Sequence, residues 1–358
     1  MNRRQMISRA MGAMATLGAN AAMSPIIADA AARKPSVARV AGGPPGGAAD
    51  GRAAFLRSYM RRPGRKNVLA WAPVANGFQH NSISHALCLL EHLGYVSGLY
   101  DTFIHTDSQP ITLHGLIGSY GQGVMGRDLN NYDAIVCVGV REVFLTDRQR
   151  ADLLDFIRNG GGFVGVHAAS TMFLPWRAFG KRRDEEAGCG RTFKPWPQFN
   201  EMLGAEFVEH PYGVIEAPVI VDDPRFPATS FLPAKFNLRD EMYEFKNFSR
   251  EQMDVVLRLD SSGLDLQRFG VTDRTADWPL AWAKRYGKGR VFYCALGHSQ
   301  ETWDIPDVQR IYFEALRWAL RLQDAEVASH PMRKVAGAAR DLPPPPAPSG
   351  PRWALAAG

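Results

Sequence analysis

Short apolar runs alternate with segments of helical periodicity along most of this chain, between residues 67 and 323. A continuous apolar run such as YDAIVCVGV at 132–140 is typical of a parallel strand that is covered on both faces. The segment 82–94 instead places apolar residues at helical spacing and ends at Gly94. Repetition of strand, helix and strand predicts an α/β fold, a mainly parallel sheet with helices on both faces.

The same patterns give the expected position of each element. Strands are expected at 67–72, 95–100, 132–140, 162–166, 214–221, 253–259, 279–285 and, after a turn, within 286–296. Helices are expected at 82–94, from an N-cap at Thr146 to Arg158, and at 305–323. Ligands of such sheets bind at the carboxyl ends of the strands, so those ends are where a functional site is expected.

Residues 1–32 have the features of a twin-arginine export signal. Arg3 and Arg4 form the arginine pair, a mild apolar stretch covers 11–22, and the ADA motif at 28–30 offers a cleavage site. This pattern predicts delivery to the periplasm or secretion from the cell. The alternative interpretation is a disordered basic N-terminus.

Two further segments differ in composition from the rest of the chain. Residues 33–66 are rich in Gly, Pro, Ala and Arg and are interpreted as a linker, and residues 324–358 end in a proline-rich tail. The sequence therefore predicts one domain at 67–323. It contains no run of 18 apolar residues, so no membrane span is expected.

The charge and the cysteines exclude several classes of protein. The formal net charge is +6, but the basic residues are scattered and form no stripe with interleaved aromatic residues, so nucleic-acid binding is not expected. The four cysteines form no C-x-x-C pair, which argues against zinc-ribbon and thioredoxin-like proteins. Export would permit a disulfide, but the sequence indicates neither a pairing nor an oligomeric state.

Three histidines follow predicted strands: His80 after a short loop, and His167 and His298 immediately. A single histidine in such a place is more often a structural hydrogen-bonding group, but three at the ends of parallel strands converge on one edge. Neutral imidazole is a common zinc ligand and a usual general base. These three residues are therefore predicted to bind a divalent metal, zinc above all, with Glu241 completing the set or orienting a histidine.

Other side chains near these positions are candidates for contact with a substrate. We assign this role to His80, Phe78, His210, Trp303 and Asp240. Aromatic residues in loops can stack on sugar faces, and the alternative is that they fill the core beneath the loops.

Seven motifs in order resemble the trehalose-utilisation (ThuA-like) family over about residues 67–322. They are GF-x-H at 77–80, YDAIV at 132–136, GGGFVGVHAAS at 160–170, LGAEFVEHP at 203–211, DEMYEF at 240–245, PLAWAKRYGKGRVFY at 279–293 and LGHS at 296–299. The resemblance implies a flavodoxin-like fold similar to class I glutamine amidotransferases. In that superfamily a cysteine nucleophile occupies the position held here by His167, so the usual glutaminase chemistry is not expected. The superfamily's catalytic histidine corresponds to His298.

The resemblance also places the chain in sugar metabolism, particularly that of disaccharides oxidised to 3-keto derivatives. We therefore expect an enzyme, a hydrolase or an isomerase, that acts on a small carbohydrate through His167, His298 and Glu241 as catalytic residues. The alternative is a non-catalytic module that binds a carbohydrate or assembles with a partner at the same edge.

Overall fold

The computed structural model describes residues 61–74, 79–114, 128–140, 144–174, 177–178, 181–182, 195–275 and 277–344. The predicted export signal, most of the predicted linker, and Phe78 lie outside the described residues.

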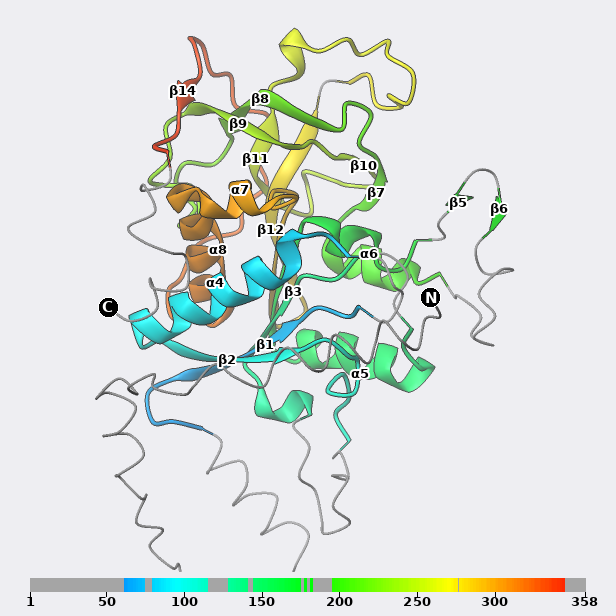
Figure 1. Ribbon diagram of the computed structural model, residues 1–358, viewed down its shortest axis with the longest axis vertical. Coiled ribbons are helices and arrows are strands. Elements are labelled where there is room, and N and C mark those ends of the chain that lie inside the picture. Colours follow the sequence, from blue (N-terminus) through cyan, green and yellow to red (C-terminus); the bar gives the residue numbers. More distant parts are fainter. Residues whose placement is uncertain are drawn as a thin grey trace, which may run out of the picture. The chain divides into compact units, whose positions relative to one another are not determined.

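A ten-stranded sheet forms the centre of the domain, in the order β14-β9-β8-β11-β12-β13-β4-β3-β1-β2 (Figure 1). One half is parallel and consists of β13 (Gly289–Cys294), β4 (Gly162–Val166), β3 (Ala134–Cys137), β1 (Lys66–Trp71) and β2 (Tyr100–His105). The other half runs through β12 (Trp278–Tyr286), β11 (Asp254–Leu259), β8 (Val214–Val221) and β9 (Lys235–Glu241), which pair in antiparallel fashion, to β14 (Arg340–Asp341). The predicted α/β class and mainly parallel sheet are confirmed.

Helices cover both faces of the sheet. Figure 1 shows α4, α7 and α8 on one face and α5 and α6 on the other. Their bounds are Ser82–Ser97 for α4, Asp147–Arg158 for α5, Pro197–Leu203 for α6, Gln300–Asp304 for α7 and Pro306–Ala319 for α8. Within the described part of the chain, no helix combines the length and the apolar character needed to span a bilayer.

Short elements complete the fold. Among the described residues they are the paired strands β7 (Glu206–Glu209) and β10 (Glu244–Lys246), the pair β5 (Arg177–Ala178) and β6 (Lys181–Arg182), and the 3-10 helices η1 (Leu129–Asn131), η2 (His167–Thr171) and η4 (Ser261–Gly263).

Local sequence explains where α5 and its neighbouring strands form. Thr146 caps α5 as predicted, and its side chain and that of Gln149 form a capping box that satisfies two free N–H groups at the helix start. All residues of β3 and β4 are buried, which agrees with their continuous apolar sequence.

The helix α4 and strand β2 differ from the prediction. The helix continues past Gly94 to Ser97 and ends at Gly98, whose φ of 68° is left-handed. The predicted strand at 95–100 is therefore wrong, and β2 begins only at Tyr100. A glycine is needed at position 94 of this helix because the ring of Tyr100 packs where a side chain at Gly94 would extend.

The domain also extends beyond the predicted boundary at residue 323. Arg290 forms an ion pair with Asp324, and β14 adds to the edge of the sheet beside β9. The first part of the predicted tail, residues 324–344, thus packs against the domain. The proline-rich end follows it and lies outside the described residues.

Replacing Gly94 with alanine tests the packing of α4 on β2. The added Cβ would lie 2.5 Å from the Tyr100 ring and 2.8 Å from the Tyr100 carbonyl oxygen. We expect the free energy of unfolding to fall by about 1–3 kcal/mol, measured by denaturant titration. Gly263→Ala is the control, because its Cβ would meet no atom within 4 Å. Equal stability of the two variants would contradict this packing.

Candidate metal centre

His167 lies at the sharp turn between β4 and η2, with a left-handed φ of 43°. Such a φ is uncommon for a residue with a side chain and is kept only where the surroundings enforce it. Its carbonyl oxygen accepts a hydrogen bond of 2.6 Å from the Tyr293 hydroxyl. Its ring Nδ1 lies 2.5 Å from the Ala295 carbonyl oxygen, which can only accept, so Nδ1 carries the proton. In the neutral ring, Nε2 then presents its lone pair to the site.

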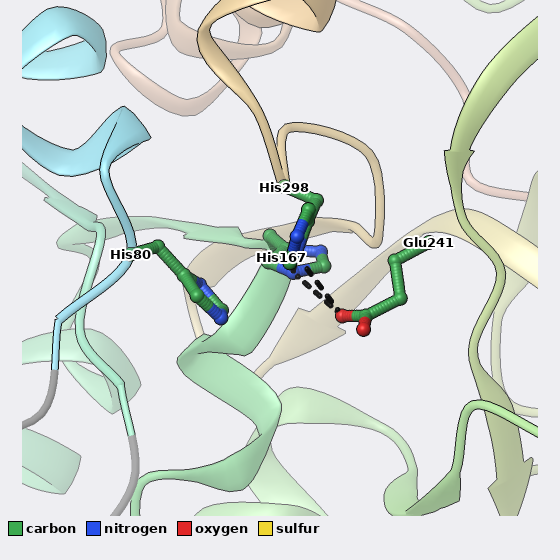
Figure 2. Close-up of side chains that lie close together, drawn as sticks. All are labelled: His80, His167, Glu241 and His298. Atoms are coloured by element: carbon green, nitrogen blue, oxygen red, sulfur yellow. Dashed lines mark hydrogen bonds and ion pairs between the residues drawn. The ribbon is translucent and has the colours of Figure 1, made fainter. Parts of the chain in front are cut away.

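Four side chains converge on one point, as Figure 2 shows. His167 Nε2, His298 Nδ1 and Glu241 Oε2 form a triangle with sides of 3.2, 3.3 and 3.4 Å. The His80 ring lies 5.0 Å from that of His167 and 4.8 Å from that of His298, between centroids. One ligand atom from each of the four residues lies within 4.8 Å of all the others.

These separations fit the donor atoms of one divalent cation. Two donors that are each about 2.1 Å from a tetrahedral zinc ion lie about 3.4 Å apart. Imidazole nitrogens with one carboxylate oxygen are ligands that zinc accepts. The carbonyl group that holds His167 Nδ1 is the usual outer partner of a metal-bound histidine. The residues present therefore fit a metal.

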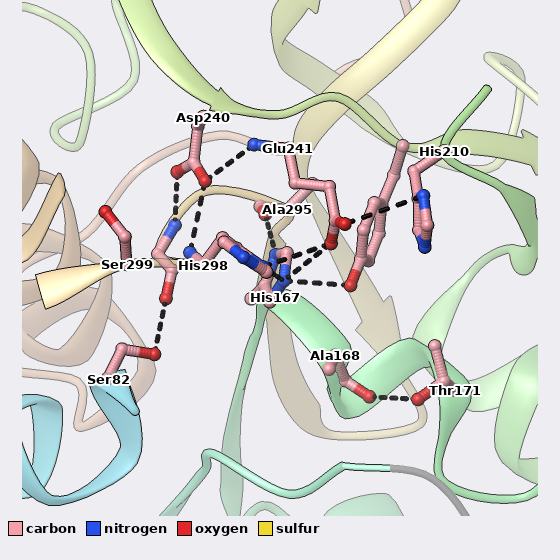
Figure 3. A network of polar contacts seen from close by, with 12 residues as sticks. Ser82, His167, Ala168, Thr171, His210, Asp240, Glu241, Ala295, His298 and Ser299 are labelled. Atoms are coloured by element: carbon pink, nitrogen blue, oxygen red, sulfur yellow. Dashed lines mark hydrogen bonds and ion pairs between the residues drawn. The ribbon is translucent and has the colours of Figure 1, made fainter. Parts of the chain in front are cut away.

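Asp240 fixes the loop that carries His298, as Figure 3 shows. Its carboxylate accepts backbone hydrogen bonds from Gly297 at 2.7 Å, from His298 at 3.2 Å and from Glu241 at 2.8 Å. Burial raises the pKa of Asp240, and these three donors and His167 oppose that shift. The end of β9 and the loop after β13 are thus joined directly beneath the site.

The histidines keep Glu241 ionised. Burial alone would raise the pKa of Glu241, but the neighbouring His167, His298 and His210 outweigh it and hold that pKa well below its usual range. The hydrogen bond to Glu241 in turn raises the pKa of His298, against the effect of burial. The site therefore presents a fixed negative charge among imidazoles.

Tyr243 and His210 form the next layer around Glu241. The Tyr243 hydroxyl lies 2.9 Å from His167 Nε2, and burial raises its pKa well above the ordinary value, so it stays a neutral phenol. His210 Nδ1 lies 3.5 Å from Glu241 Oε1, and the His210 side chain is 35% exposed. Tyr243 is not among the site residues predicted from the sequence. Its spacing of two residues from Glu241 was the available signal, because alternate residues of an extended chain point the same way.

Two predicted substrate contacts have structural roles instead. Trp303 is fully buried, stacks on Tyr312, and donates its indole N–H to the Gly297 carbonyl oxygen at 3.1 Å. Asp240 is also buried, and both of its oxygens accept backbone N–H groups. The assignment of substrate binding to Trp303 and Asp240 is therefore wrong, since neither side chain is open to a ligand. Both hold the Gly297 loop in place.

A cleft of about 680 Å³ adjoins His80 and His298, two of the four converging side chains. His80 and His298 form part of its wall. Most of its other residues are polar, namely Gln79, Asn81, Ser84, Thr106, Ser299, Gln300 and Glu301. Its volume lies within the range of small-molecule sites.

The fold and the site define an α/β protein with a histidine-rich centre at the carboxyl ends of parallel strands. The chain belongs to the trehalose-utilisation (ThuA) family, which matches residues 67–189 and 184–319. The resemblance stated from the sequence motifs is thereby confirmed. The family gives a context of carbohydrate utilisation.

Solved structures of ThuA-like proteins share the fold. One from Bacteroides uniformis has a TM-score of 0.51 and 22% identity, covering 72% of this chain and 93% of that one. One from Parabacteroides merdae has a TM-score of 0.51 and 18% identity, covering 73% and 92%. At these identities the likeness concerns the fold alone. No curated protein matches this sequence.

Replacing Asp240 with asparagine tests its role as a positioning residue. An amide nitrogen cannot accept, so at least one buried N–H of the loop loses its acceptor, and the free energy of unfolding should fall by about 1–3 kcal/mol. Asp107→Asn is the control, because the Asp107 carboxylate is exposed and, among the described residues, accepts the backbone N–H of Gln109 at 2.7 Å. Chemical unfolding of both variants checks this, and an unchanged Asp240→Asn protein would contradict it.

Proposed function

We propose that this protein is a metal-dependent enzyme acting on a small carbohydrate, with a divalent cation, zinc foremost, bound by His80, His167, His298 and Glu241. The observation that carries the proposal is the triangle of 3.2, 3.3 and 3.4 Å between three donor atoms. Hydrogen bonds alone can bring such groups together, but the matching of all three sides to one coordination sphere favours a cation.

The proposed reaction is hydrolysis or isomerisation of a keto-sugar or keto-glycoside. A bound divalent cation polarises a carbonyl oxygen or lowers the pKa of a bound water. The residues of the chain supply orientation and proton transfer: Ala295 holds the His167 ring through its carbonyl oxygen, and His210, beside Glu241 and partly exposed, is placed to exchange a proton with a substrate hydroxyl.

Family membership and the adjoining cleft support a carbohydrate as the substrate. The family context is trehalose utilisation. The cleft beside His80 and His298 is lined largely by amide and hydroxyl side chains, which hydrogen-bond sugar hydroxyl groups. We further propose that the protein is exported by its twin-arginine signal, a proposal supported by the leader pattern at residues 1–32.

Removing one proposed ligand should abolish most of the zinc affinity. We expect His298→Ala and Glu241→Gln each to remove the zinc bound at this centre, with a loss of affinity there larger than the roughly 10–100-fold that losing an outer hydrogen-bonding partner costs. His92→Ala is the matched control, because His92 is an exposed residue of α4. Zinc bound after equilibrium dialysis gives the measurement. Equal affinity in all three variants and the wild type would refute the metal centre.

Turnover separates an enzyme from a binding module. The zinc-loaded wild type should convert a 3-keto-glycoside, and His167→Ala should lose that activity, because its Nε2 belongs to the triangle of donor atoms. His210→Ala should lower kcat and retain zinc, since His210 lies beyond the proposed ligands. Absence of conversion by the wild type, with sugar binding retained in calorimetry, would leave the binding module as the function.

A further inference from the structure

A second cluster of potential ligands lies at the other end of β8 from Glu241. Glu241 pairs with Val214, the first residue of β8. Asp223 lies just beyond Val221, the last residue of that strand, with Asp222 between them. A strand of this length extends about 25 Å. Antiparallel pairing brings the end of β8 beside the start of β11, where Asp254 lies. The segment after α8 adds His330, and one ligand atom from each of Asp223, Asp254 and His330 lies within 4.8 Å of the others.

The groups in this cluster face one another as acceptors. His330 Nδ1 lies 2.9 Å from the Pro331 carbonyl oxygen, which can only accept, so Nδ1 carries a proton. His330 Nε2 lies 3.1 Å from Asp254 Oδ1 and 3.1 Å from the Val255 carbonyl oxygen. In the neutral ring the Nε2 lone pair would therefore face a carbonyl oxygen and an oxygen of the Asp254 carboxylate, both of them acceptors.

Asp254 adds a second, independent sign of a missing ligand. Its side chain is fully buried, and its Oδ2 has no hydrogen-bond partner in the part of the chain that the structure describes. A buried carboxylate oxygen without a donor is costly. The buried Asp254 carboxylate is thus open to a ligand at this oxygen.

Positively charged groups of the protein balance the two carboxylates, Asp223 and Asp254, only in part. Arg225 binds Asp223 through both carboxylate oxygens, but its side chain is 72% exposed. A second proton on His330 would satisfy its Nε2 and still leave Asp254 Oδ2 without a donor. A cation held by one oxygen of each carboxylate and by the imidazole nitrogen would balance this charge.

We propose that Asp223, Asp254 and His330 bind a second divalent cation, with the Val255 carbonyl oxygen facing the same point. Two carboxylates, an imidazole and a carbonyl oxygen suit zinc or manganese better than a soft, thiolate-preferring ion. The proposed site is structural. It connects β8 and β11 of the sheet to the segment at 324–344, which otherwise lies along the domain surface through contacts such as Arg333 to Val221.

The test uses the full chain with the first site disabled by Glu241→Gln and His298→Ala, so that a failure of the proposed enzyme site does not affect the result. In equilibrium dialysis against zinc alone, this background should bind about one equivalent. Adding Asp254→Asn or His330→Gln should weaken that binding about tenfold or more. His114→Gln is the matched control, because His114 also lies near a carboxylate, at 3.7 Å from Asp152, and is 56% exposed. Equal zinc binding by the background and both added variants would overturn the proposal.

A second measurement guards against a variant that fails to fold. In the same background, zinc should slow trypsin cleavage after Arg333 and Lys334, since the cation holds this segment to the sheet. His330→Gln should remove the protection, and His114→Gln should keep it. Protection that zinc does not change in the background protein would also overturn the proposal.

Discussion

The carboxylate of Asp240 is the interaction on which the site depends. It accepts N–H groups from the residue after it in its own strand and from two residues of the loop after β13. These hydrogen bonds join the antiparallel half of the sheet, which carries Glu241, to the parallel half, which carries His298. Inside a protein such bonds to an ionised group are strong, and a lost acceptor is not replaced by water. The positions of both side chains therefore follow from one buried group.

The Gly297 loop is held by hydrogen bonds from several elements. Ser82 donates to the Gly297 carbonyl oxygen at 3.0 Å and Trp303 donates to the same atom. The φ of Gly297 is 114°, a conformation that a residue with a side chain rarely adopts. These contacts fix the backbone that carries His298, as expected for a side chain that is preorganised at a site.

Much of the fold and the location of the candidate site could be predicted from the sequence. Continuous apolar runs identified β3, β4 and β8, and the rule for strand ends selected His167 and His298. The strand β9 was missed because its sequence, KFNLRDE, is largely polar. The roles of Asp240 and Trp303 were missed because they depend on where backbone N–H and carbonyl groups of a distant loop point, which no side-chain pattern encodes.

The order of strands has a consequence for how the chain matures. β13 is made late in synthesis, yet it inserts between β4 and β12 at the middle of the sheet. The ribosome must therefore release nearly the whole domain before the two halves of the sheet can join. His298 lies in the loop after this strand, so it meets His167 and Glu241 only after β13 has paired with β4 and β12.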